Sequence, residues 1–213
     1  MPEKKAIIAL NGELRDKTDQ YLSLFRNQET LFIAADAGAL LYEKLGIKPN
    51  IIIGDFDSLE NKNKIIKNGV EIIEYPVDKD ETDGELAIEY CIDNGIKEIT
   101  IIGAFGGRYD HQLANIFLLE YAYYHQIDAV IKDIDIEIGL INDSKGFVNC
   151  ANHILSLIPL DKKVYGVSIE GCKYNLDKAD MCRFKSRGIS NQILEEKALI
   201  TVKKGLLLYI KTN

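Results

Sequence analysis

Apolar and polar positions alternate along this chain in two different ways, and the change comes near residue 130. Before that point, short continuous apolar runs are separated by segments whose apolar residues recur at helical spacing. The runs predict strands over residues 6–10, 31–35, 49–54, 71–74 and 98–102, and the periodic segments predict helices over residues 37–45, 82–94 and 109–124. Fully apolar strands that alternate with helices indicate a parallel sheet covered on both faces.

Beyond about residue 130 the helical periods end, and short strand-like runs follow one another. Strands are predicted over residues 134–141, 154–158, 164–169, 198–202 and 206–210, with Gly, Asn and Asp between them. This pattern is typical of a β sandwich or barrel, and we place the change between residues 127 and 133. The predicted fold class is α/β: an N-terminal parallel-sheet α/β domain over residues 1–130, followed by a smaller C-terminal all-β sandwich domain over residues 131–213.

Composition excludes some classes of protein. The 213 residues are enough for one large domain or two small ones with buried cores. A net charge of −7 argues against a nucleic-acid-binding surface, which would be basic. No apolar run reaches the roughly 18 residues that cross a bilayer, and the first residues do not resemble a signal peptide, so we expect no membrane association.

The four cysteines are scattered, and none forms a CxxC pair. We therefore expect reduced thiols, a cytoplasmic location and no zinc site.

Acidic residues stand where two of the predicted strands end. Asp36 closes one strand, and Asp55 and Asp57 follow the apolar run 51–53. Residues two apart on an extended chain point the same way, so Asp55 and Asp57 are expected to face one side together. Two such carboxylates repel unless they share a cation, and magnesium is the usual choice where phosphates also bind.

A third strand ends in the glycine-rich segment 103–111. Gly106 and Gly107 permit a close approach of the backbone to phosphate, and Arg108 offers a planar donor fork for phosphate oxygens. The helix that follows points its first amide groups to the same place. Since ligands of open parallel sheets bind at the carboxyl ends of the strands, the three loops are expected to form one phosphate site.

The segment 78–83 precedes a predicted helix. Thr82 and Glu85 form a capping-box pattern, which leaves Lys79, Asp80 and Asp83 unexplained. Structural alternatives remain open for the other polar residues: Asp36 as a helix cap, the Asp55–Asp57 pair as a polar turn, Arg108 as a surface residue, and His111 as a local hydrogen-bonding group.

Together these segments resemble the thiamine pyrophosphokinases, in order and approximate spacing. The matching segments are 36–38, 49–58, 78–83 and 106–111, with 171–174 and 188–191 in the C-terminal half. The resemblance implies transfer of the diphosphoryl group of ATP to the hydroxyl of thiamine, giving thiamine diphosphate and AMP. It also implies a homodimer with active sites at the interface.

By this resemblance, residues take roles position by position. Asp55, Asp57 and Asp83 match acidic positions around magnesium and the phosphates, and Arg108 and Asp110 match a GGRxD segment. The remaining matched residues fall to ATP (Asp36, Lys79, Asp80, Thr82, His111) and to thiamine from the partner subunit (Ser190, Asn191). The chain has no tryptophan, so stacking on thiamine falls to Tyr174 or Phe184, unless these belong to the sandwich core.

Some points stay open from sequence. Either Asp83 or Asp110 could take the proton of the attacking hydroxyl. The alternatives to thiamine pyrophosphorylation are a pyrophosphokinase for another alcohol such as a hydroxymethylpterin, a non-catalytic thiamine or nucleotide sensor, and a metal-dependent phosphatase.

Overall fold

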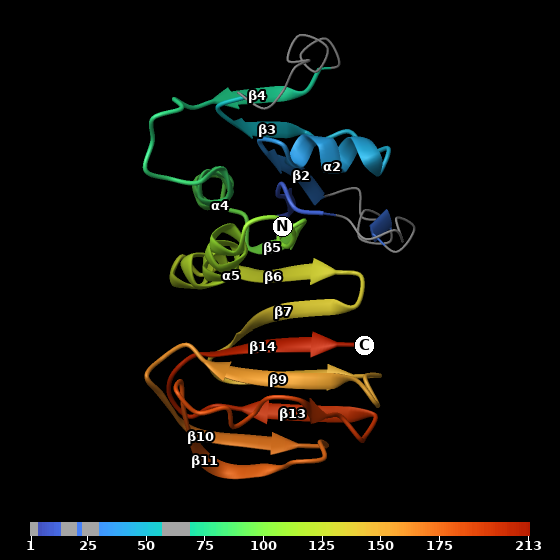
Figure 1. Ribbon diagram of the computed structural model, residues 1–213, viewed down its shortest axis with the longest axis vertical. Coiled ribbons are helices and arrows are strands. Elements are labelled where there is room, and N and C mark those ends of the chain that lie inside the picture. Colours follow the sequence, from blue (N-terminus) through green and yellow to red (C-terminus); the bar gives the residue numbers. More distant parts are fainter. Residues whose placement is uncertain (1–3, 14–20, 23–29, 57–68) are drawn as a thin grey trace. The chain divides into compact units, whose positions relative to one another are not determined.

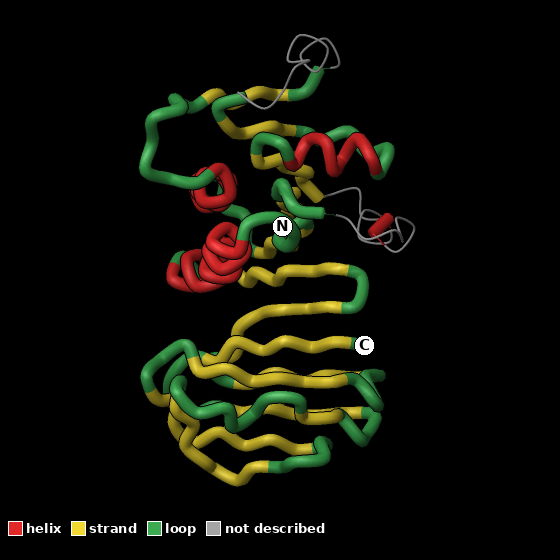
Figure 2. The backbone as a smooth tube through the Cα atoms, in the orientation of Figure 1, coloured by secondary structure: helices red, strands yellow, loops and turns green. Residues whose placement is uncertain are grey.

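The computed structural model of the chain describes residues 4–13, 21–22, 30–56 and 69–213. The chain divides into two compact units, Met1–Ile134 and Asp135–Asn213 (Figure 1). All helices of the described residues belong to the first unit (Figure 2). In the described part of the chain, no helix has the length and apolar character needed to cross a membrane.

The first unit is built on a parallel sheet in the strand order β6-β5-β1-β2-β3-β4. Every neighbouring pair within this order runs parallel. The strands are β1 (Lys5–Ala9), β2 (Thr30–Ala35), β3 (Ile51–Gly54), β4 (Glu71–Glu74), β5 (Glu98–Ile102) and β6 (Asp128–Asp133). The predicted parallel α/β domain is therefore confirmed, and the predicted boundary at residues 130/131 falls within β6.

The helices that the described residues place with this sheet are α2 (Gly38–Lys44), α4 (Asp83–Asp93) and α5 (Tyr109–Tyr124). Ile7 and Ile52 lie in one core cluster with Leu41 of α2. Ile8 and Ile53, which point to the opposite face of the sheet, are also fully buried. Burial on both faces explains why these strands read as continuous apolar runs.

The second unit contains only strands, and they form two antiparallel sets. One set has the order β12-β9-β14-β7 and the other β11-β10-β13-β8. The bounds are β7 (Ile136–Ile141), β8 (Ser144–Val148), β9 (Ile154–Pro159), β10 (Lys163–Glu170), β11 (Leu176–Cys182), β12 (Asn191–Gln192), β13 (Lys197–Thr201) and β14 (Leu207–Thr212). Side chains from both sets share one buried cluster, including Leu157, Tyr209, Val167 and Ile200. The predicted sandwich is confirmed.

Sequence reasoning missed strands β6, β8, β11 and β12. In β8 only Phe147 is buried, and in β11 only Met181 is, so neither strand carries a clear apolar alternation. Their pairing with β13 and β10 makes them strands, and pairing partners are not visible in the local sequence.

Candidate active site

A pocket of about 660 Å³ lies in the first unit, where several parallel strands and connecting loops end. Leu10, Ala35 and Ala104 place it at the carboxyl ends of β1, β2 and β5, as expected for ligand sites of open parallel sheets. The segments before α4 and at the start of α5 complete its walls.

This pocket collects most of the residues predicted for ATP and catalysis. Its lining includes Asp36, Lys79, Thr82, Asp83, Arg108, Asp110 and His111. Asp80 and Asp55 are not part of the lining, but Asp55 lies 4.0 Å from Lys79, which is part of it. Asp57 lies outside the described residues, and Ser190 and Asn191 belong to the second unit.

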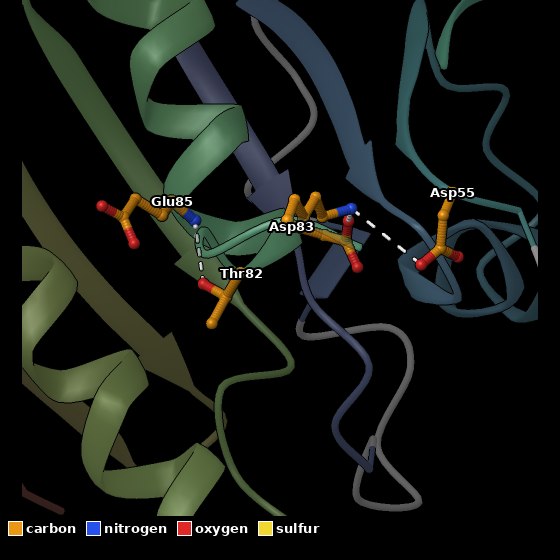
Figure 3. A network of polar contacts seen from close by, with 5 residues as sticks. Asp55, Thr82, Asp83 and Glu85 are labelled. Carbon is orange, nitrogen blue, oxygen red and sulfur yellow. Dashed lines mark hydrogen bonds and ion pairs between the residues drawn. The ribbon is translucent and has the colours of Figure 1, made fainter. Parts of the chain in front are cut away.

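The ammonium group of Lys79 approaches two carboxylates, those of Asp55 and Asp83. Both aspartates are labelled in Figure 3. Lys79 Nζ donates a hydrogen bond to Asp83 Oδ1 at 2.7 Å and lies 4.0 Å from Asp55 Oδ2. Asp83 is the first residue of α4, and its neighbour Thr82 caps that helix by accepting a hydrogen bond from the Glu85 amide at 3.2 Å. The cap fixes where α4 begins, and thereby places Asp83 opposite the end of β3.

The expectation that Asp55 and Asp57 face one side together stays a prediction, because Asp57 lies outside the described residues. Strand β3 ends at Gly54, and Phe56 has a left-handed backbone with φ +62°. The ring of Phe56 is buried in the cluster that contains Tyr42 of α2. The left-handed backbone of Phe56 turns the chain directly after Asp55.

Asp36 is a buried residue at the end of β2. The N-cap position of α2 is its neighbour Ala37, and the Asp36 carbonyl accepts a hydrogen bond from the Ala39 amide at 3.1 Å. Asp36 has φ +43°, and its amide donates a hydrogen bond to the Ile53 carbonyl at 2.7 Å. This bond joins the ends of β2 and β3 where the pocket opens.

The glycine-rich loop presents Arg108 and Asp110 as a pair. Arg108 Nε donates to Asp110 Oδ1 at 3.1 Å, and a second hydrogen bond joins the guanidinium to Oδ2. The hydrogen bond from Arg108 lowers the pKa of Asp110 to about 2, with help from the His111 amide. Asp110 in turn raises the pKa of Arg108. Gly107, with φ +67°, makes the turn that presents this pair.

Two wall segments of the pocket were missed from sequence. Asn11 and Gly12 line it after β1, although the sequence indicates there only the end of a strand. A Cβ on Gly12 would lie 2.2 Å from the Gly103 carbonyl oxygen, so only glycine fits. Asn115 of α5 donates to the Ala104 carbonyl at 2.9 Å and holds the glycine-rich loop. The Asn-Gly pair at a strand end was the available signal.

In the second unit, Asn191 is buried and fully engaged with its own chain. Its Oδ1 accepts hydrogen bonds from the amides of Tyr174 (2.9 Å) and Gln192 (3.0 Å), and its Nδ2 donates to the Tyr174 carbonyl at 2.8 Å. Tyr174 itself is 62% exposed, and Phe184 is 71% exposed. The alternative that either aromatic residue belongs to the sandwich core is therefore wrong.

The donor set suits a hard cation in part. Asp55 and Asp83 already share the positive charge of Lys79, and carboxylate oxygens are the ligands that magnesium prefers. Within the described ranges, no group of three or more metal-ligating side chains is assembled. Two carboxylates plus phosphate oxygens form the usual arrangement for magnesium at nucleotide sites.

Comparison with protein families supports the same assignment for both units. The model of the thiamin pyrophosphokinase catalytic domain matches residues 21–131, and the model of the vitamin B1 binding domain of that enzyme matches residues 141–207. Thiamine pyrophosphokinase of Bacillus subtilis (strain 168) is 27% identical over 196 residues, which cover 90% of this chain and 92% of that protein. Thiamine pyrophosphokinase 1 of Oryza sativa subsp. japonica is 27% identical over 230 residues, 95% of this chain and 85% of that protein.

Solved structures show the same fold. The crystal structure of thiamine pyrophosphokinase from Bacillus subtilis superposes with a TM-score of 0.87 at 26% identity and covers 99% of both chains. Yeast thiamin pyrophosphokinase superposes with a TM-score of 0.81, covering 100% of this chain and 87% of that one. Its identity of 18% supports the fold alone.

Proposed function

Because the chain belongs to the thiamine pyrophosphokinase family, we propose that it transfers the diphosphoryl group of ATP to the hydroxyl oxygen of thiamine. Thiamine diphosphate and AMP are the products. The observation that carries this proposal is the pocket at the sheet edge, where Lys79, Asp83 and Arg108 surround a space suited to a polyphosphate. Such transfers depend on alignment and charge neutralisation, which these groups supply.

The competing functions have less support. A hydroxymethylpterin acceptor would need no vitamin B1 binding domain, yet that domain matches most of the second unit. A sensor would need no set of carboxylates beside the phosphate groups, and the pocket has Asp36, Asp83 and Asp110 in its wall. A phosphatase would not need a separate acceptor domain.

On the donor side, Lys79 and Arg108, which both line the pocket, would bind the phosphate chain. Magnesium, held by Asp55, Asp83 and Asp57, would neutralise charge on the phosphate oxygens. Asp80 stays predicted as an ATP-binding residue, and Thr82 acts through the cap of α4. Attack falls on the β-phosphorus, so that AMP leaves.

Asp110 orients Arg108 in this scheme and does not accept the proton of thiamine. Its pKa of about 2 makes it a weak base, and both its oxygens bind the guanidinium. Asp83 is the other carboxylate proposed for proton transfer. In a loose transition state the attacking hydroxyl has formed little bond to phosphorus, so its proton need not be removed early. Alignment of the phosphate groups by Arg108 therefore contributes more to the rate than a general base does.

The acceptor site requires the second unit, and we place it on a homodimer. Helix α5 has an exposed apolar stripe at helical spacing: Tyr109, Leu113, Phe117 and Tyr124. Stripes of this kind mark interaction surfaces, and a second copy of the chain is the proposed occupant. Ser190 and Tyr174 of one subunit then contact thiamine at the pocket of its partner.

All four cysteines are free, in keeping with the predicted cytoplasmic location.

The test is product analysis. Purified protein is incubated with ATP, Mg²⁺ and thiamine, and products are separated by chromatography with mass detection. Thiamine diphosphate with equimolar AMP supports the proposal, whereas thiamine monophosphate with ADP would replace it by ordinary kinase chemistry. Parallel incubations with a hydroxymethylpterin and with no acceptor test the other two enzymatic functions.

A further inference from the structure

Lys79 is an unusually enclosed lysine for a residue in a loop. Its side chain is 11% exposed, and its ammonium group approaches Asp83, Asp55 and, at 5.9 Å from the ring centroid, Tyr75. By comparison, the lysine of the Lys5–Glu98 ion pair is 43% exposed. Enclosing a lysine side chain costs conformational entropy, so favourable contacts with Asp83 and Asp55 must offset that cost.

The ammonium group of Lys79 approaches two of the carboxylates that are proposed to hold magnesium. Asp55 arrives from the end of β3 and Asp83 from the start of α4 (Figure 3), and Lys79 Nζ lies 4.0 Å from an oxygen of Asp55 and 2.7 Å from an oxygen of Asp83. Two carboxylates held near each other repel, and one positive charge removes most of that repulsion. A divalent cation bound to the same oxygens would be repelled by the lysine. The lysine and the metal ion therefore exclude each other from this position.

We propose that Lys79 is an internal counter-ion. Before nucleotide binds, its ammonium group pairs with Asp55 and Asp83 in place of a metal ion. When the metal ion binds together with ATP, Lys79 leaves Asp83 and pairs with a phosphate oxygen of ATP. The proposal rests on the proposed function, because it takes this pocket as the phosphate site. Both partners of Lys79, first the Asp83 carboxylate and then the phosphate oxygen, are negatively charged. Free Mg²⁺ then competes with the lysine, whereas Mg²⁺ that enters with ATP supplies the lysine with a new partner.

This arrangement couples the binding of metal and nucleotide. By thermodynamic linkage, if ATP raises the affinity for Mg²⁺ by drawing the lysine away, Mg²⁺ raises the affinity for ATP by the same factor. A purely structural ion pair between Lys79 and Asp83 would contribute to stability but would leave the response to Mg²⁺ unchanged. The two roles therefore differ in a measurable quantity that does not depend on turnover.

The experiment compares the wild-type protein with Lys79→Met and with the control Lys5→Met. Lys5 also forms an ion pair, but it starts β1 and so lies at the opposite edge of the sheet from the pocket. Each protein is titrated with Mg²⁺ without nucleotide at constant ionic strength, and the thermal midpoint is recorded. We expect Lys79→Met to reach its half-maximal shift at a roughly tenfold lower Mg²⁺ concentration, because one nearby positive charge is gone. Lys5→Met should match the wild type.

An equal Mg²⁺ midpoint in the wild type and Lys79→Met would overturn the proposal, and so would the lack of any Mg²⁺ response in both. Lys79→Gln, which keeps a polar side chain, repeats the comparison if the methionine variant does not fold. In the wild type, a non-hydrolysable ATP analogue should lower the half-maximal Mg²⁺ concentration, and in Lys79→Met it should do so less. Failure of product formation in the wild type would instead refute the proposed function, independently of these titrations.

Discussion

Replacement of Asn191 by alanine distinguishes two roles of this residue in thiamine binding: direct contact with thiamine, and indirect action by holding Tyr174 in position. The side chain is 3% exposed and makes three hydrogen bonds, two of them to the backbone of Tyr174. A net contribution of about 1 kcal/mol per hydrogen bond, with added cost for buried groups that lose a partner, predicts a loss of roughly 2–4 kcal/mol. For a chain of this length, that loss corresponds to a midpoint lower by roughly 5–15 °C.

The same variant should raise the KM for thiamine, because Tyr174 loses the two backbone bonds that fix its position. The KM for ATP should stay unchanged, since the proposed ATP pocket lies in the first unit. A suitable control is Asn94→Ala, which removes a hydrogen bond to the Tyr90 carbonyl at an exposed helix end. It should lower stability by less than about 1 kcal/mol and leave both KM values unchanged.

A double-mutant cycle with Tyr174→Ala decides the mechanism. If Asn191 acts by holding Tyr174, the double variant has the thiamine KM of Tyr174→Ala alone, because interacting residues are not additive. Additive effects on KM, together with unchanged stability of Asn191→Ala, would refute this reasoning and assign Asn191 a direct contact with thiamine. An unchanged thiamine KM in Tyr174→Ala would remove Tyr174 from the acceptor site.

Three further predictions concern the ATP pocket. Gly12→Ala should destabilise the protein by about 1–3 kcal/mol and weaken ATP binding, because its Cβ would meet the Gly103 carbonyl; urea unfolding and nucleotide titration measure both, and unchanged values would contradict the close packing. Arg108→Ala should raise the KM for ATP and lower the thermal midpoint only slightly, since the side chain is 74% exposed and exposed ion pairs contribute little; unchanged kinetics would exclude it from the site. The Arg108 hydrogen bond lowers the pKa of Asp110 from 3.8 to about 2, so the pair favours the fold above pH 3.8 and loses that contribution as the pH falls through about 2. Asp110→Asn should therefore reduce kcat without shifting the acidic limb of the pH–rate profile, and a shifted limb would make Asp110 a proton acceptor.

The sequence alone determined the elements that depend on local periodicity. The strands 71–74 and 98–102 and the helix 109–124 were predicted to the residue, because apolar spacing, caps and glycine stops are read within a few positions. The same logic placed Thr82 as the cap of α4 and brought the polar loops to one edge of the sheet. Strands β8 and β11 escaped because their pairing partners, and not their own pattern, make them strands.

Only the tertiary structure decided which polar groups meet. The left-handed backbone of Phe56 turns the chain after Asp55, and the start of α4 brings Asp83 close to Lys79, which also approaches Asp55. The engagement of Asn191 with Tyr174 likewise joins residues that are 17 positions apart. These contacts link segments that are distant along the chain, and their geometry follows from how β3, α4 and the strands of the second unit pack. Local residue pattern determines what each segment becomes, whereas packing between segments determines the distances on which the chemistry depends.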